Sequence, residues 1–213
     1  TAAGLPEVSA DFRVWTVRLQ RGIYFADDPA FKGRRRELLA HDYIYAIQRT
    51  VDPANISPLE KDMIDLGIVG LQEARDAAVK NKAPFDYDRP VAGLRALDSH
   101  TLQITVDKPR PRLVYVLADA SVLGGTAREV VEHYGQAISE HPVGTGPFRL
   151  KSWRRSSRIV LERNPAFREM LYDGEPAADD AAGQALLARL KGRRLPMVDE
   201  VEVSIVDEFQ PQW

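Results

Sequence analysis

Apolar and polar residues alternate in several short stretches of the chain, which is the pattern of half-buried strands. This pattern predicts strands at 15–19, 91–97, 101–106, 148–153, 158–162 and 198–206. In the last of these stretches we expect Val201, Val203 and Ile205 to point inward, with Glu202 and Ser204 pointing outward.

Other stretches carry apolar residues at helical spacing, and they predict helices at 40–50, from 57 toward 80, at 127–134 and at 178–190, with a short helix or a buried turn at 113–117. Ser57 can cap the second of these helices, with Glu60 completing a capping box. Gly67 and Gly70 argue against one straight helix there. Because strands and helices follow one another in an irregular order, the predicted fold class is mixed α/β (α+β).

A loop rich in glycine and proline, HPVGTGPF, precedes the strand at 148–153. Gly144 and Gly146 should permit backbone angles that a Cβ would resist, and the two prolines stiffen the loop. A phosphate-binding loop is not expected, because Arg149 stands where a third glycine is needed and a strand follows instead of a helix. An ordinary tight turn between strands is the alternative interpretation.

The residues from Pro142 to Leu150, with Trp153 and the stretch RIVLERNP at 158–165, resemble the signature of the family 5 extracellular solute-binding proteins. These are the oligopeptide- and dipeptide-binding components of ABC importers. The stretches VWTVRLQRGIYFADD, around Gly22, and ALDSHTLQITVDKPRP resemble further family segments. The resemblance therefore covers most of the chain.

The resemblance implies the fold of a periplasmic-binding-protein-like (class II) lobe I fragment, with mixed sheets flanked by helices and the second lobe absent. It implies a lobe I subdomain at 12–143. Residues 144–213 would return to the core sheet of that lobe, with an inserted helix near 178–190. It also implies that the protein is the solute-binding component of an ABC importer and not an enzyme. Such a component captures a peptide or similar small solute between two lobes and delivers it to a membrane permease.

In relatives, the segments equivalent to 57–63, 118–122 and 144–146 approach the ligand. The resemblance therefore suggests these ligand-binding residues: Leu59, Met63, Asp119, Ser121 and Thr145. Asp119 alone offers a charge to a cationic group. Three of them also have a structural interpretation: Leu59 and Met63 as core residues, and Asp119 as a turn or helix cap.

Composition and motifs give no support to catalysis. The chain has 213 residues, a net charge of −2 and no cysteine. Its four histidines are scattered without metal-ligand spacing, and no serine has the surroundings of a nucleophile elbow. We therefore expect no catalytic residue, no metal and no cofactor. The basic run at 33–36 lacks interleaved aromatic residues, so no nucleic-acid partner is expected either.

No apolar run reaches the roughly 20 residues that cross a bilayer. The resemblance implies a periplasmic or extracellular location, membrane-associated if the protein is a lipoprotein, and a monomer. Two alternatives remain open: a protein-interaction domain without a small-molecule ligand, using 33–36 and 178–190, and a non-catalytic domain of an enzyme.

Overall fold

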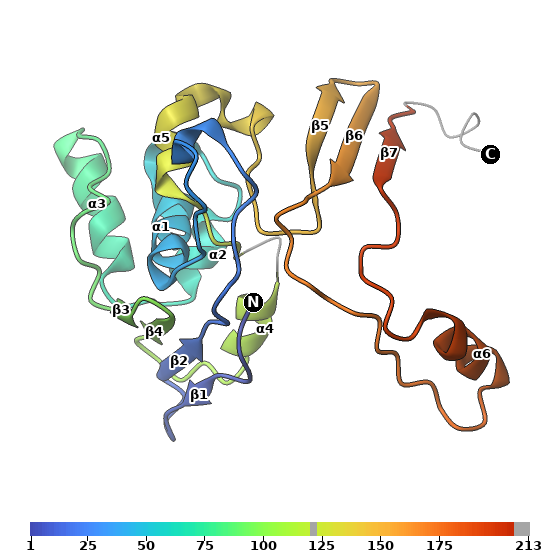
Figure 1. Cartoon of the computed structure of the whole chain (residues 1–213). Helices are drawn as coiled ribbons and strands as arrows, with labels where there is room; N and C mark the ends of the chain where they lie inside the picture. The colour runs from blue at the N-terminus through green and yellow to red at the C-terminus, as the bar shows by residue number, and fades with distance from the viewer. Residues whose placement is uncertain (120–122, 207–213) are drawn as a thin grey trace. The chain divides into compact units, whose positions relative to one another are not determined.

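The computed structural model describes residues 1–119 and 123–206 (Figure 1). The chain divides into two compact units. Unit 1 comprises Thr1–Ile23 and Glu37–Glu132, and unit 2 comprises Tyr24–Arg36 and His133–Trp213. Each unit has an antiparallel sheet of its own.

The sheet of unit 1 has the strand order β1-β2-β4-β3, with these bounds: β1 Glu7–Val8, β2 Val14–Arg18, β3 Leu94–Asp98 and β4 Thr101–Thr105. Trp15 pairs with Ile104, and Ile104 pairs with Leu94, so the three side chains lie in one row across the sheet. All three are buried. The period of two at 15–19 and 101–106 is thus confirmed, while the strand expected from residue 91 begins only at Leu94.

Helix α1 (Ala40–Val51) packs on β3 and β4. Tyr43 and Ile47 share one buried stripe, as the helical spacing predicted, while Ala46 and Thr50 on the same predicted face are half-buried. The N-cap position is Leu39, whose side chain cannot accept a hydrogen bond. Instead the buried carboxylate of Asp42 accepts one from the backbone N–H of Leu39 at 2.7 Å, which satisfies a donor at the helix start.

The segment after residue 57 forms two helices, α2 (Glu60–Asp65) and α3 (Leu71–Asn81). Between them Gly67 and Gly70 both have positive φ, at 70° and 82°, so the break expected there is confirmed. The expected capping box is wrong. The helix starts at Glu60 itself, whose carboxylate lies 2.6 Å from Nε of Arg75 in α3 and does not return to the backbone of Ser57.

Two further helices belong to this part of the chain, α4 (Leu113–Ala118) and α5 (Arg128–Tyr134), and both were expected. Short 3-10 turns occur at η1 Pro29–Phe31, η2 Pro53–Asn55 and η3 Gly135–Glu140. The largest fully buried side chains of unit 1 come from its sheet, its helices and its connecting segments: Ile23, Leu38, Ile47, Leu71, Leu102 and Ile104. Unit 1 therefore has a core of its own.

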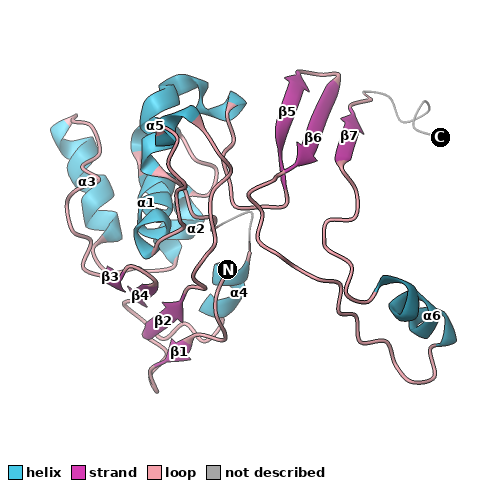
Figure 2. Cartoon of the chain, in the orientation of Figure 1, coloured by secondary structure: helices cyan, strands magenta, loops and turns pink. Residues whose placement is uncertain are grey.

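The sheet of unit 2 has the order β5-β6-β7, with these bounds: β5 Phe148–Arg154, β6 Arg158–Arg163 and β7 Glu200–Ser204 (Figure 2). The turn expected at 155–157 joins β5 to β6, and Ser156 has a φ of 54° there. One face of this sheet carries cross-strand ion pairs, including Arg149 with Glu162 at 2.7 Å and Arg158 with Glu202 at 3.2 Å.

The opposite face of the same sheet is apolar but is not buried. Trp153, Ile159 and Val203 lie in register across it. Trp153 is 39% exposed and Val203 is 43% exposed. The expectation that Val203 and Ile205 point inward is therefore wrong for the described residues. The alternating sequence pattern predicts on which face of the sheet a side chain lies. It does not show whether other elements pack on that face.

Helix α6 (Ala181–Leu190) lies between β6 and β7 in the sequence (Figure 2). It begins later than the predicted residue 178, because Asp180 is its N-cap and accepts a hydrogen bond from the N–H of Gly183 at 2.9 Å. The mixture of helices with antiparallel sheets agrees with the predicted fold class. None of the helices in the described part of the chain has the length and apolar character that a bilayer crossing requires.

Candidate functional site

The loop at 142–147 is held from both sides by hydrogen bonds within unit 2. The side-chain amide of Asn164 donates to the carbonyl of Gly146 at 2.9 Å, and its backbone N–H donates to Pro147 O at 2.9 Å. Asn164 Oδ1 accepts from the N–H of Ala166 at 3.0 Å, and the residue is 2% exposed. On the other side, Ala26 N–H donates to the carbonyl of Gly144 at 2.8 Å. Asn164 therefore fixes the loop against the end of β6.

The glycines of this loop are not needed for its backbone conformation. Neither Gly144 nor Gly146 has a positive φ. A Cβ at Gly144 would meet no atom within 4 Å, and one at Gly146 would lie 4.0 Å from the nearest oxygen. The expectation that both positions use angles unfavourable to other residues is therefore wrong. What shapes the loop is the pair of prolines and the hydrogen bonds of Asn164.

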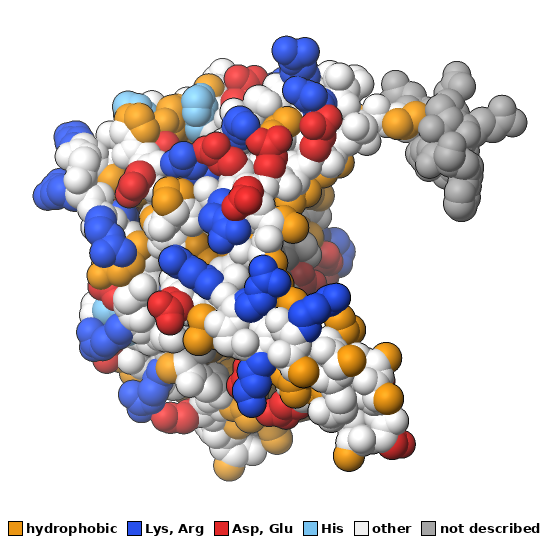
Figure 3. Space-filling model, turned by 45° about the vertical axis from the view of Figure 1, so that its right-hand side comes forward, with side chains coloured by type: hydrophobic (Ala, Val, Ile, Leu, Met, Phe, Trp, Pro, Cys, Tyr) orange, Lys and Arg blue, Asp and Glu red, His pale blue; other side chains and the backbone are white. Residues whose placement is uncertain are grey.

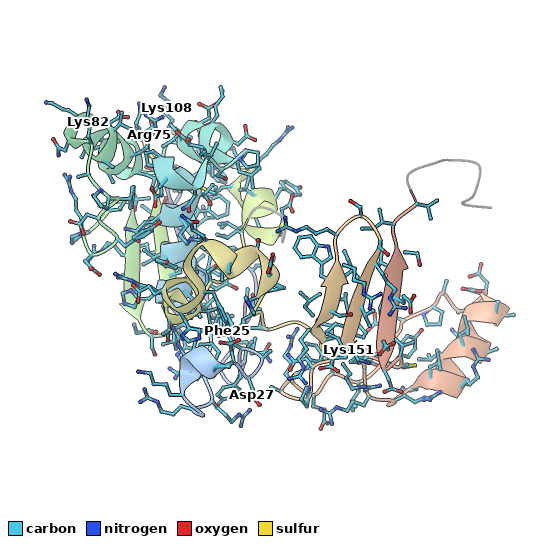
Figure 4. The ribbon with its side chains drawn as sticks, turned by 90° about the horizontal axis from the view of Figure 1, so that it is seen from above. Phe25, Asp27, Arg75, Lys82, Lys108 and Lys151 are labelled. Carbon is cyan, nitrogen blue, oxygen red and sulfur yellow. The ribbon has the colours of Figure 1, made fainter. Side chains whose placement is uncertain are left out.

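A pocket of about 230 Å³ lies beside this loop in unit 2. Its lining includes Asp27 and Lys151, which Figure 4 labels, together with Asp28, His141, Arg149 and Glu162. Most of these charges are already paired. Lys151 binds Glu200, and Arg149 binds Glu162. Within the described residues, Asp27 has no ion pair and no side-chain hydrogen bond, so its carboxylate is available to a ligand.

The wall of this pocket is stiffened by Tyr134 and Asp28. The Tyr134 hydroxyl donates to Oδ2 of Asp28 at 2.9 Å, while the ring of Tyr134 stacks on His141 with centroids 3.9 Å apart. Burial, followed by the contact with Asp28, raises the pKa of the Tyr134 hydroxyl. Asp28 also accepts a hydrogen bond from the N–H of Ala30. Asp28 therefore has a structural role at the start of the Pro29–Phe31 turn.

Another pocket, of about 420 Å³, lies in unit 1. It is formed by the end of α1, the Pro53–Asn55 turn, the start of α2 and residues 124–126. Leu59 lines it together with Arg49, Ser57 and Gly124. The neighbouring carboxylate of Asp52 is buried and is occupied by Tyr87, whose hydroxyl donates to it at 2.6 Å. Burial, followed by the hydrogen bond to Asp52, raises the pKa of the Tyr87 hydroxyl.

The five candidate ligand-binding residues fall in both units. Leu59 is half-buried at the unit 1 pocket, and Met63 lies one helical turn later, where its side chain is 3% exposed and belongs to the core. Asp119 is exposed at the C-terminal end of α4. Ser121 lies outside the described residues. Thr145 is half-buried in the 142–147 loop of unit 2.

One cluster of polar residues was not found from the sequence. Ser99 Oγ lies 2.8 Å from Nδ1 of His100, and His100 Nε2 lies 3.1 Å from Oε1 of Glu37. The backbone N–H of Gly22, followed by His100, lowers the pKa of Glu37. His100 is 6% exposed, and none of the three residues lines either pocket described above. We therefore assign the cluster a structural role, joining the β3–β4 turn to the segment before α1.

The family model of the bacterial extracellular solute-binding proteins, family 5 middle, matches residues 1–211. The chain belongs to this family. The resemblance carried by residues 142–165 is thereby confirmed, and it extends over both units.

Several curated relatives of this family 5 protein are peptide-binding proteins by name. The periplasmic oligopeptide-binding protein OppA of Salmonella typhimurium is 31% identical over 159 residues, which are 74% of this chain and 26% of the relative. The periplasmic murein peptide-binding protein MppA of Escherichia coli is 29% identical over 156 residues, or 73% of this chain and 26% of the relative.

Solved structures give the same result. Haemophilus influenzae OppA, in its complex with the peptide RPPGFSPFR, matches with a TM-score of 0.62 and 27% identity over 78% of this chain and 29% of that one. The pheromone receptor PrgZ shares the fold, with a TM-score of 0.66 over 99% of this chain and 34% of that one. The periplasmic-binding-protein-like fold class is confirmed. The chain spans about a quarter of the length of the curated relatives it matches.

Proposed function

We propose that this chain is part of the solute receptor of an ABC importer, which captures a peptide or a similar small solute between two lobes and delivers it to a membrane permease. The observation that carries the proposal is the family match over residues 1–211. It is supported by the likeness to an OppA structure that contains a bound peptide. The family consists of solute-binding proteins, and we extend this to the proposal that the protein is not an enzyme.

The receptor we propose is larger than the chain described here, because the chain covers only 26% of OppA from Salmonella typhimurium. Residues 12–143 and 144–213 would then be two segments of its first lobe, and the second lobe would supply the opposing wall. Closure of two lobes excludes water and strengthens each polar contact with the solute. A single wall lacks that gain, so the chain by itself should bind its solute weakly.

The wall of the binding site is proposed to include Leu59, Asp119, Ser121 and Thr145, with Met63 supporting it from the core. Leu59 has the clearest support, because it lines a pocket of about 420 Å³. Asp119 is exposed and can offer a carboxylate to a cationic group of the solute. Peptide backbones have N–H and C=O groups at every residue, so a receptor can recognise them with little dependence on the side chains.

The proposal includes a periplasmic or extracellular location, a permease partner and a monomeric receptor that binds no nucleic acid. On the face that Figure 3 shows, Lys and Arg side chains are interspersed with Asp and Glu, which favours neither a nucleic acid nor an anionic membrane surface. In the basic run, Arg35 lies over the ring of Tyr24 at 3.9 Å. Arg35 therefore has a structural partner in Tyr24, within the same unit.

The test is isothermal titration calorimetry of the protein produced from its complete reading frame, with defined di-, tri- and oligopeptides. Saturable binding of intact peptides is the expected result. Cleavage of the peptides would instead support an enzyme, and the absence of binding to any small solute would support a protein-interaction domain. Either result would refute the proposal.

A matched pair of variants tests the wall itself. Leu59→Ser removes an apolar side chain from the pocket and should weaken peptide binding by about tenfold, the loss expected for half of a buried leucine. Leu97→Ser changes an exposed leucine on β3 and should leave the affinity unchanged. Equal affinities in the two variants would remove Leu59 from the proposed wall.

A further inference from the structure

The unit 1 pocket has a distinctive charge. It is formed by Ala46, Arg49, Thr50, Asn55, Ser57, Pro58, Leu59, Gly124 and Thr126, and we call it the Arg49 pocket. Arg49 is the one charged residue in that lining. Two other pockets mix both signs: the one beside the 142–147 loop includes Asp27 and Lys151, and another in unit 1 includes Glu60 and Arg75.

The charge of Arg49 is not neutralised within the described residues. Two arginines near α1, α2 and α3 have carboxylate partners: Arg75 pairs with Glu60 at 2.6 Å and Arg128 pairs with Asp88. Arg49 forms no such pair and no side-chain hydrogen bond there, although it is half-buried. The nearest acidic residue in the sequence, Asp52, accepts hydrogen bonds from Tyr87 and from Ala54 N–H and is 7% exposed.

Among the remaining polar groups of the pocket, Ser57 can add one donor, while the protons of Thr50 and Asn55 are already engaged by backbone carbonyls. Ser57 Oγ accepts a hydrogen bond from the N–H of Leu59 at 3.2 Å, which leaves its hydroxyl proton to donate elsewhere. The hydroxyl of Thr50 donates to the carbonyl of Ala46, and the amide nitrogen of Asn55 donates to the carbonyl of Arg49. With Pro58 and Leu59 as apolar walls, the space fits a short aliphatic chain that ends in an anion.

We propose that the Arg49 pocket binds a carboxylate of the transported solute, with Arg49 as its ion-pair partner. The inference rests on the proposed function and narrows its substrate class to solutes with an acidic group, such as peptides that contain Glu or Asp. A planar guanidinium can hold both oxygens of a carboxylate, which gives selectivity over the isosteric amide. Hydrogen bonds to charged groups change affinity by about tenfold to a hundredfold.

The experiment compares alanine tripeptides that carry Glu at one position with the same peptides carrying Gln, using the protein from its complete reading frame. At one position the Glu peptide should bind at least about tenfold more tightly than the Gln peptide. Arg49→Gln should abolish this preference while the Gln peptide keeps its affinity, and Arg49→Lys should retain part of it. Arg89→Gln, which removes an exposed charge in unit 1, is the matched control and should retain the preference.

Equal affinities for Glu and Gln peptides in the wild-type protein would overturn this inference and leave the proposed function intact. A preference that survives in Arg49→Gln would do the same, since another residue would then be its source. If Arg49 only stabilises the C-terminal end of α1, Arg49→Gln should lower the affinity for Glu and Gln peptides by the same factor. That result would also overturn the inference.

If no peptide binds, the proposed function fails, and a second measurement decides the inference separately. Amide NMR spectra of the present chain are recorded with millimolar glutarate and with neutral glutaramide. Shifts at Arg49 and Leu59 with glutarate alone, absent in Arg49→Gln, would support a carboxylate site independent of peptide transport. Equal shifts with both compounds, or none with either, would overturn it.

Discussion

The side chain of Asn164 makes two hydrogen bonds that hold the 142–147 loop against the end of β6, and Asn164→Ala removes both. The carbonyl of Gly146 loses a donor at 2.9 Å, and the N–H of Ala166 loses an acceptor at 3.0 Å. Asn164 is 2% exposed, so its side chain forms both bonds away from water.

Each buried partner left without a hydrogen bond costs about 1–3 kcal/mol. Gly146 and Ala166 are themselves only half-buried, so the lower end of the range applies to each and the total comes to about 2–3 kcal/mol. With a urea m-value of about 2 kcal/mol per M, the unfolding midpoint of unit 2 should fall by about 1 M.

The assay must report on unit 2 alone, because a chain of two units does not have to unfold in one step. Amide hydrogen exchange of β5 and β6 at increasing urea provides that report. Asn81→Ala, an exposed asparagine at the end of α3, is the matched control and should leave the exchange of unit 2 unchanged. A loss below about 0.5 kcal/mol in Asn164→Ala, the size of an ordinary surface effect, would refute the stabilising role of the two bonds.

Two further predictions concern unit 1 and the loop. The Gly22 N–H and His100 hold the pKa of Glu37 below its ordinary value of 4.5, so the stabilisation is complete above about that pH and is lost as the pH falls through the lowered folded-state pKa. Glu37→Gln should therefore flatten the acid limb of unfolding free energy against pH, and parallel curves for the two proteins would contradict this. Gly93→Ala should lower the free energy of unfolding by at least about 2 kcal/mol, because its Cβ would lie 2.6 Å from backbone atoms, whereas Gly144→Ala should change it by less than about 0.5 kcal/mol. Similar thermal melts for the two alanine variants would refute the comparison.

Several elements could be predicted because their signals are local. The strands at 148–154 and 158–163 follow from alternation on either side of a short turn, and α1 follows from its apolar stripe. The break near Gly67 was predicted because glycine is a poor helix former, and the structure gives this glycine a positive φ. The capping box at Ser57 failed because a tertiary partner, Arg75, takes the carboxylate of Glu60. A local motif shows which hydrogen bonds a side chain can form, but residues far away in the sequence compete for the same side chain.

The candidate site was predicted less completely than the fold. The resemblance placed Leu59 near a ligand, and the structure places it at a pocket. Arg49 becomes a candidate only when the lining of that pocket is known. The cluster of Ser99, His100 and Glu37 had no sequence signal, because His100 and Glu37 stand far apart in the chain and meet only in the folded unit.

The sequence by itself determined the family, through the long match around Pro142–Pro165, and it determined most strands and helices. Periodicity and turn residues act within a few positions, so they can be read without the fold. Only the tertiary structure decided that the glycines of the loop are free of strain, that Val203 lies on an exposed apolar face and that Arg49 has no carboxylate partner among the residues that the structure describes. Exposure and charge pairing depend on which distant side chains arrive at each position, and no local pattern carries that information.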